Sequence, residues 1–210
     1  MIGILKGAVY MGANSTNNLS RKQKESLLFG NTYYIQYNSQ KGLYCISQLK
    51  SMADDKATDC FYYHIYLDLL LQSMGALHDR FYSKDTLYSE TNAKDYSFDN
   101  TQYPLLSNKA IRNYCEHIDE REDGLIKNYT YFGTFNVVFQ EMDGELKSEL
   151  LNGKHSNLLN LETLQYSIID PKQNYNTITL DLNALEAELR RIYVIAQQKW
   201  SLISQGIFQI

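Results

Sequence analysis

The chain has 210 residues, of which 44% are hydrophobic, so it is long enough for one generous domain with a substantial core or for two small domains. Its formal charge of −4 argues against a protein that holds duplex nucleic acid through a broad basic surface, but it is compatible with an enzyme that grips a few nucleotides. The chain contains only two prolines, which favours long helices. It also contains eighteen tyrosines, whose rings either fill the core and interfaces or stack on bases.

Cysteine usage and hydropathy indicate the class of protein. Cys45, Cys60 and Cys115 form no CxxC pair and no cluster with zinc spacing, so we expect reduced thiols and neither a metal nor a cofactor. The apolar N-terminus is short and interrupted by glycines, and no run of residues reaches the length of a membrane span. We therefore expect no signal peptide and a soluble, cytoplasmic protein.

Two long helices are predicted in the first part of the chain, after a short strand or irregular arm over residues 1–18. Apolar residues recur at spacings of mostly three or four over residues 20–52, which predicts a helix. After a polar hinge, residues 58–81 predict a second helix that is apolar around most of its circumference, which is typical of a central helix. Its polar exceptions, His64, Asp68 and Gln72, recur every four residues and form one stripe.

The middle of the chain predicts a loop and then a third helix. Residues 83–106 are rich in Ser, Asn and Asp and are predicted to form a loop. Ser107 is predicted to cap a helix over residues 107–124, which Gly124 ends.

The last part of the chain changes its hydrophobic period. Residues 131–141 are β-branched and aromatic and predict a strand, and two further apolar runs flank a hairpin loop at 170–174. His155 is predicted to lie in a loop. Residues 183–204 predict an amphipathic helix, in which Asn183 and Glu186 form a capping box. These elements predict one domain over residues 1–210: a mainly α helical bundle, over about 20–125 and 183–205, with a small β-rich insert over about 131–182.

The third predicted helix carries the most suggestive chemistry, in residues 111–120. Asn113 and His117 are four residues apart and share a helical face, and Arg112 has the reach to bend back toward the imidazole. An imidazole can exchange a proton near neutral pH, and a guanidinium can pair with a phosphate and stabilise charge that develops in a transition state. The same residues could also form an ordinary polar helix surface.

Arg112, Asn113 and His117 resemble the Arg–polar–x(3–5)–His signature of the HEPN domains, small helical bundles found in prokaryotic toxins, phage-defence proteins and CRISPR-associated ribonucleases. The resemblance covers the predicted helical bundle, and the β-rich insert departs from the minimal HEPN fold. It implies metal-independent cleavage of RNA, in which the 2′-hydroxyl attacks the adjacent phosphate. It also implies a homodimer whose two motifs face each other across a cleft, and a toxin in this family could have an antitoxin protein as partner.

Three further residues, His64, Asp68 and Glu116, are candidates for supporting the site. His64 and Asp68 could assist the site as an imidazole oriented by a carboxylate, or they could form a buried hydrogen-bonded pair that serves only packing. Glu116 is a supporting candidate because it adjoins His117, although acidic residues there also fit a solvated helix face. The rival function is a non-catalytic helical module that binds a protein or a nucleotide.

Overall fold

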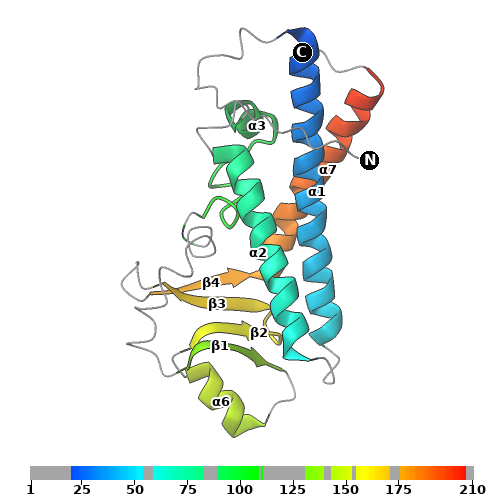
Figure 1. Cartoon of the computed structure of the whole chain (residues 1–210). Coiled ribbons are helices and arrows are strands. Elements are labelled where there is room, and N and C mark those ends of the chain that lie inside the picture. Colours follow the sequence, from blue (N-terminus) through cyan, green and yellow to red (C-terminus); the bar gives the residue numbers. More distant parts are fainter. Residues whose placement is uncertain are drawn as a thin grey trace.

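The computed structural model describes residues 20–53, 59–82, 89–108, 110, 131–139, 143–152, 155–170 and 176–206. Its helices are α1 (Arg21–Ala53), α2 (Cys60–Tyr82), α3 (Ser89–Asp95), α6 (Gly144–Asn152) and α7 (Leu182–Ser204). Its strands are β1 (Tyr131–Val138), β2 (His155–Asn160), β3 (Gln165–Asp170) and β4 (Asn176–Asp181). The predicted class is therefore confirmed at the level of a mostly helical protein with a small sheet before its last helix (Figure 1).

The three long helices pack side by side, and α1 is the middle one because it contacts both α2 and α7 (Figure 1). Gly42 lets α7 approach closely, since a Cβ atom at this position would lie only 2.9 Å from the Leu189 side chain. The prediction that residues 58–81 form the central helix is wrong. The apolar circumference of α2 is covered instead by shorter elements, because Phe81 packs against Tyr96 and Phe98, and Tyr63 packs against Phe139.

The four strands form one sheet in the order β1-β2-β3-β4. Strands β1 and β2 are parallel and are separated in the chain by α6, whereas β2, β3 and β4 pair antiparallel. Tyr166 and Leu180 point to the buried face, while Ser167 and Thr179 on the other face share a hydrogen bond of 3.1 Å. The alternation shows why these segments form half-buried strands.

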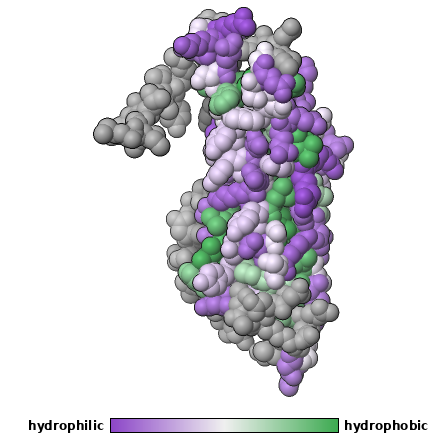
Figure 2. All heavy atoms as spheres, turned by 90° about the vertical axis from the view of Figure 1, so that its right-hand side faces the viewer, coloured by the Kyte–Doolittle hydropathy of each residue, from purple (hydrophilic) through white to green (hydrophobic). Residues whose placement is uncertain are grey.

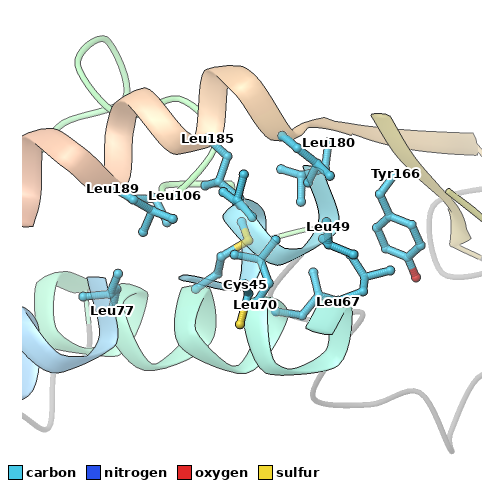
Figure 3. Packing of buried hydrophobic residues seen from close by; sticks show 14 of the residues in the cluster. Cys45, Leu49, Leu67, Leu70, Leu77, Leu106, Tyr166, Leu180, Leu185 and Leu189 are labelled. Atoms are coloured by element: carbon cyan, nitrogen blue, oxygen red, sulfur yellow. The ribbon is translucent and has the colours of Figure 1, made fainter. Parts of the chain in front are cut away.

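Helices and sheet contribute to a single hydrophobic core. In Figure 3, Tyr166 and Leu180 from the sheet lie close to Leu49 of α1, Leu67 of α2 and Leu185 of α7. Residues 131–182 therefore include one wall of the core, and the sheet is not an appendage to an independent helical bundle.

Two local predictions are wrong, each because tertiary contacts outweigh a weak local signal. His155 begins β2 and does not lie in a loop, and this short polar strand is held between β1 and β3. Helix α3 lies within the predicted loop at 83–106, since seven residues are too few to show helical periodicity. Helix α6 lies between β1 and β2, where no element is predicted from the sequence.

The predicted helix caps also differ from those in the structure. The N-cap of α7 is Asp181, whose side chain accepts hydrogen bonds from the backbone N–H groups of Asn183 and Ala184 at 2.9 and 3.0 Å. The predicted capping box of Asn183 and Glu186 is therefore wrong. Asn108 accepts a hydrogen bond from the Ala110 N–H at 2.9 Å, whereas Ser107, the predicted cap, donates to the Pro104 carbonyl. The remainder of the predicted third helix lies outside the described residues.

Candidate functional site

The residues that carry the HEPN resemblance lie outside the part of the chain that the structure describes. These residues are Arg112, Asn113, Glu116 and His117. The described chain reaches Ala110 before them and begins again at Tyr131 after them. What the structure does describe is how the segment that enters the motif is held.

A buried carboxylate fixes the segment that precedes the motif. Glu188 of α7 is only 5% exposed, and its two carboxylate oxygens accept hydrogen bonds from the backbone N–H groups of Leu105 and Leu106 at 3.0 and 2.9 Å. Burial raises the pKa of Glu188, and these two hydrogen bonds together with the charge of Arg191 oppose the rise. The pair of hydrogen bonds ties residues 105–106 to the first half of α7.

Further contacts hold the segment that precedes the motif, in addition to those of Glu188. Arg191 donates to the backbone carbonyl of Gln102 at 2.8 Å, and its guanidinium lies 5.4 Å from the centre of the Tyr103 ring. The Tyr103 ring is buried and stacks on Phe98 with ring centres 4.7 Å apart. Asp99 accepts hydrogen bonds from the N–H groups of Thr101 and Gln102, which shapes the turn that leads into Tyr103. The chain therefore arrives at Ala110 from a well-anchored segment.

His64 and Asp68, the supporting candidates on α2, both lie at the surface. Their side chains are exposed, as is that of Gln72, so the whole predicted polar stripe faces solvent. The interpretation of His64 and Asp68 as a buried pair is wrong, because α2 turns this side away from α1. Any site that these two side chains serve would therefore lie at the surface.

The described surface also presents a row of rings, which we call the aromatic face: Phe29, Tyr33, Tyr37 and Tyr44 of α1 and Trp200 of α7. The four α1 side chains are 44%, 55%, 52% and 56% exposed, in that order. Trp200 lies 4.3 Å from Phe29 and 5.7 Å from Tyr33 between ring centres, and Tyr33 stacks beside Tyr37 at 6.3 Å. Along the axis of α1 the row spans about 22 Å. Figure 2 views the side on which α1 and α7 lie, and green and pale side chains are interspersed among purple ones along much of its length.

Helices α1 and α7, which carry the aromatic face, have a net positive charge, whereas the whole chain has a net negative charge. Helix α1 contains no Asp or Glu from Ser26 to Ala53, and α7 contains none after Glu188. The carboxylates near this face form ion pairs: Glu25 with Arg21, Glu186 with Lys50 and Arg190, and Asp95 with Lys199. By contrast, Lys22, Lys24 and Lys41 form no ion pair with another described residue.

A pocket of about 540 Å³ adjoins the aromatic face at the first turns of α1. Its lining includes Phe29 of α1 and Ile203 of α7, the hydroxyl of Ser26, and the charged side chains of Arg21, Lys22 and Glu25. Because Phe29 lines the pocket and also packs on Trp200, the pocket and the row of rings form one continuous surface. An ammonium group, a hydroxyl and exposed rings can together bind a ligand that has both charged and flat apolar parts.

The aromatic face was not identified from the sequence, although a signal for it was present. Phe29, Tyr33 and Tyr37 recur every four residues, which places them on one side of a helix. Periodicity alone does not tell whether such a side faces the core or solvent. The exposed fractions decide that this side faces solvent.

No protein-family model, no curated protein and no solved structure matches this chain. The class that the fold defines is a mostly helical protein with a small four-stranded sheet. Within the described residues, no helix has both the length and the hydropathy to span a membrane.

Proposed function

We propose that the protein is a HEPN-like, metal-independent endoribonuclease that acts in the cytoplasm as a toxin or phage-defence effector. The observation that carries this proposal is the spacing of Arg112, Asn113 and His117, which resembles the catalytic signature of that family. His117 would exchange the proton of the attacking 2′-hydroxyl or of the leaving oxygen. Arg112 would bind the scissile phosphate, and Asn113 would orient one of the two.

Two features of the described structure support this proposal. Catalysis requires groups held in a fixed geometry, and Glu188 and Arg191 anchor the segment that leads toward Arg112. An RNA substrate requires a surface without negative charge, and the side formed by α1 and the second half of α7 lacks unpaired carboxylates among the described residues.

The test of this proposal is cleavage of a labelled RNA by the purified wild-type chain and by His117→Ala. We expect cleavage by the wild type to persist in EDTA, because the proposed mechanism uses no metal, and to be abolished in His117→Ala at an unchanged thermal transition. His155→Ala is the matched control, because it removes a histidine that has no role in the proposed site. Full activity of His117→Ala would remove this residue from the mechanism.

The supporting residues on α2 are tested in the same assay. Because His64 and Asp68 are exposed, replacing either with alanine should change stability by no more than about 0.5 kcal/mol. A loss of cleavage at unchanged stability would place them in the site, and unchanged cleavage would remove them from it.

The rival function is a non-catalytic helical module, and the exposed rings of the aromatic face favour it. Large exposed aromatic surfaces commonly mark binding sites. A wild-type chain that binds a protein or a nucleotide but cleaves no RNA would support the module and exclude the enzyme.

The proposed mechanism also requires a homodimer. Two copies of the motif related by a twofold axis would supply both an acid and a base from the same residue type. Light scattering on the purified protein tests this arrangement, and a monomer at micromolar concentration would contradict the two-copy site. An antitoxin that inhibits cleavage would be a further partner.

A further inference from the structure

We infer that the aromatic face binds single-stranded RNA by stacking bases on its rings, with Trp200 and Tyr33 at the centre of the contact. This inference rests on the proposed function in naming RNA as the ligand, and it assigns the substrate a binding surface separate from the Arg112–His117 motif. The face comprises Phe29, Tyr33, Tyr37 and Tyr44 of α1 and Trp200 of α7.

The arrangement of the rings supports stacking. Phe29, Trp200, Tyr33 and Tyr37 form a continuous series, with 4.3, 5.7 and 6.3 Å between successive ring centres. Each of the three α1 rings in this series is about half exposed, so solvent reaches part of each ring. Single-stranded nucleic acid binds such rows of rings with little sequence preference, because every base has a flat apolar face.

The distribution of charge selects RNA over a second copy of this chain. Lys22 lines the pocket beside Phe29, and Lys41 follows Tyr37 by one turn of α1. The only carboxylates of α1 and α7 are Glu25, Glu186 and Glu188, and each of them accepts a hydrogen bond from another group of the described chain. A phosphate backbone would meet ammonium groups at this surface. In an isologous dimer the same surface would meet itself, so one positively charged surface would face another.

The hydrogen-bonding groups between the rings fit the same ligand. Gln40 and Ser47 are exposed on the side of α1 that carries Tyr37 and Tyr44, and Gln197 and Ser201 are exposed on α7 around Trp200. Amides and hydroxyls can donate to phosphate oxygens and can bond either edge of a base. Gln197 already donates to the Tyr193 hydroxyl and Ser201 accepts from Gln205, so a purely apolar partner would chiefly cover Gln40 and Ser47 without replacing the hydrogen bonds that water offers them.

The experiment uses the full-length His117→Ala variant, so that RNA is not consumed during the measurement. Labelled oligouridylate of about twelve nucleotides is titrated, and binding is followed by anisotropy of the label. Trp200 is the only tryptophan in the chain, so its emission reports directly on this surface. We expect Trp200 emission to be quenched along the same titration curve, and the affinity to fall steeply as salt is raised.

Substitutions on the His117→Ala background separate stacking from folding. Tyr33→Ala should weaken binding by about tenfold, whereas Tyr33→Phe keeps the ring and should bind within about twofold of the parent. Tyr62→Ala is the matched control, because Tyr62 is 53% exposed but lies on α2, away from Trp200. Thermal transitions of all variants establish that each one folds.

Three outcomes separate a failure of this inference from a failure of the ribonuclease proposal. RNA that binds without quenching Trp200 and without loss in Tyr33→Ala would overturn the aromatic face as the site while leaving the ribonuclease intact. Quenching and Tyr33 dependence in a chain whose wild type cleaves no RNA would uphold the surface and overturn the enzyme. Absence of RNA binding, with a dimer that Tyr33→Ala dissociates in light scattering, would show that a second copy covers the face and would overturn the inference.

Discussion

The two sides of α7 carry similar residue types in different environments, one buried and one partly exposed. On one side, Glu188 and Arg191 bind the backbone of residues 102–106, and Tyr103 is buried beneath them. On the other side, Trp200 meets Phe29 and Tyr33, which remain about half exposed. An aromatic ring on the first side is therefore part of the core, whereas the rings on the second side are left accessible.

This difference indicates where stability and binding reside. The anchored side contains polar groups whose removal would leave buried backbone groups without partners, so its residues determine folding. The aromatic side contains rings that solvent reaches, so its residues contribute less to stability and are candidates for recognition.

Among changes to polar groups, the largest expected effect is that of Glu188→Ala. This change leaves the N–H groups of Leu105 and Leu106 without acceptors, and each such group costs about 1–3 kcal/mol, so unfolding free energy should fall by about 3 kcal/mol. Urea denaturation measures the change. Glu186→Ala is the matched control two residues away, because it removes ion pairs at the surface and should cost less than about 1 kcal/mol. Equal losses in the two variants would contradict the assigned role of Glu188.

The pH dependence of stability separates the same two carboxyl groups. Because burial raises the pKa of Glu188 above its ordinary 4.5, the folded chain retains this proton after the unfolded chain has released it. The resulting stabilisation is complete below pH 4.5 and is lost as pH rises through the raised pKa. Glu186 behaves oppositely, since its hydrogen bond to Lys50 lowers its pKa and its contribution is lost as pH falls below 4.5.

Denaturation of wild type and Glu188→Gln across this pH range measures the effect. The wild type should lose stability relative to the variant as pH rises above 4.5, because glutamine does not titrate. A constant difference between the two proteins over the whole range would show that Glu188 titrates at its ordinary value.

The smallest expected effect lies on the aromatic side. Tyr33→Ala removes a ring that is 55% exposed, and it should change unfolding free energy by about 0.5 kcal/mol or less. Tyr103→Ala is the contrasting variant, because this ring is buried and its loss should cost about 3–5 kcal/mol. A cost for Tyr33→Ala as large as that for Tyr103→Ala would mean that the exposed rings serve packing.

The sequence predicts the long elements well and the short ones poorly. Helices α1, α2 and α7 each span 23 residues or more, so apolar spacing repeats often enough to be detected. Strand β2 is six residues of mixed polarity and α3 is seven residues, and neither carries a repeating pattern. Such short elements form because their neighbours supply partners: β1 and β3 for the strand, and α2 for the helix.

The features of the candidate site also differ in whether the sequence could predict them. The residues of the Arg112–His117 motif can be recognised in the sequence because their chemistry depends on identity and spacing. The exposure of His64 and Asp68 could not be predicted, since an apolar helix with one polar stripe looks the same whether that stripe faces a buried partner or solvent. The role of Glu188 could not be predicted either, because its partners are backbone N–H groups more than eighty residues earlier in the chain.

By itself, the sequence determined the three long helices, the mostly helical class with strands before the last helix, and the chemical repertoire of residues 112–117. Local propensity and periodicity suffice for these features, because each one depends only on residues that are close together in the sequence. Only the tertiary structure decided that α1 is the middle helix, that Glu188 binds residues 105–106, and that the exposed rings of Phe29 and Tyr33 lie against the partly buried Trp200. These features depend on which faces of distant helices meet, and burial in a shared core determines that choice.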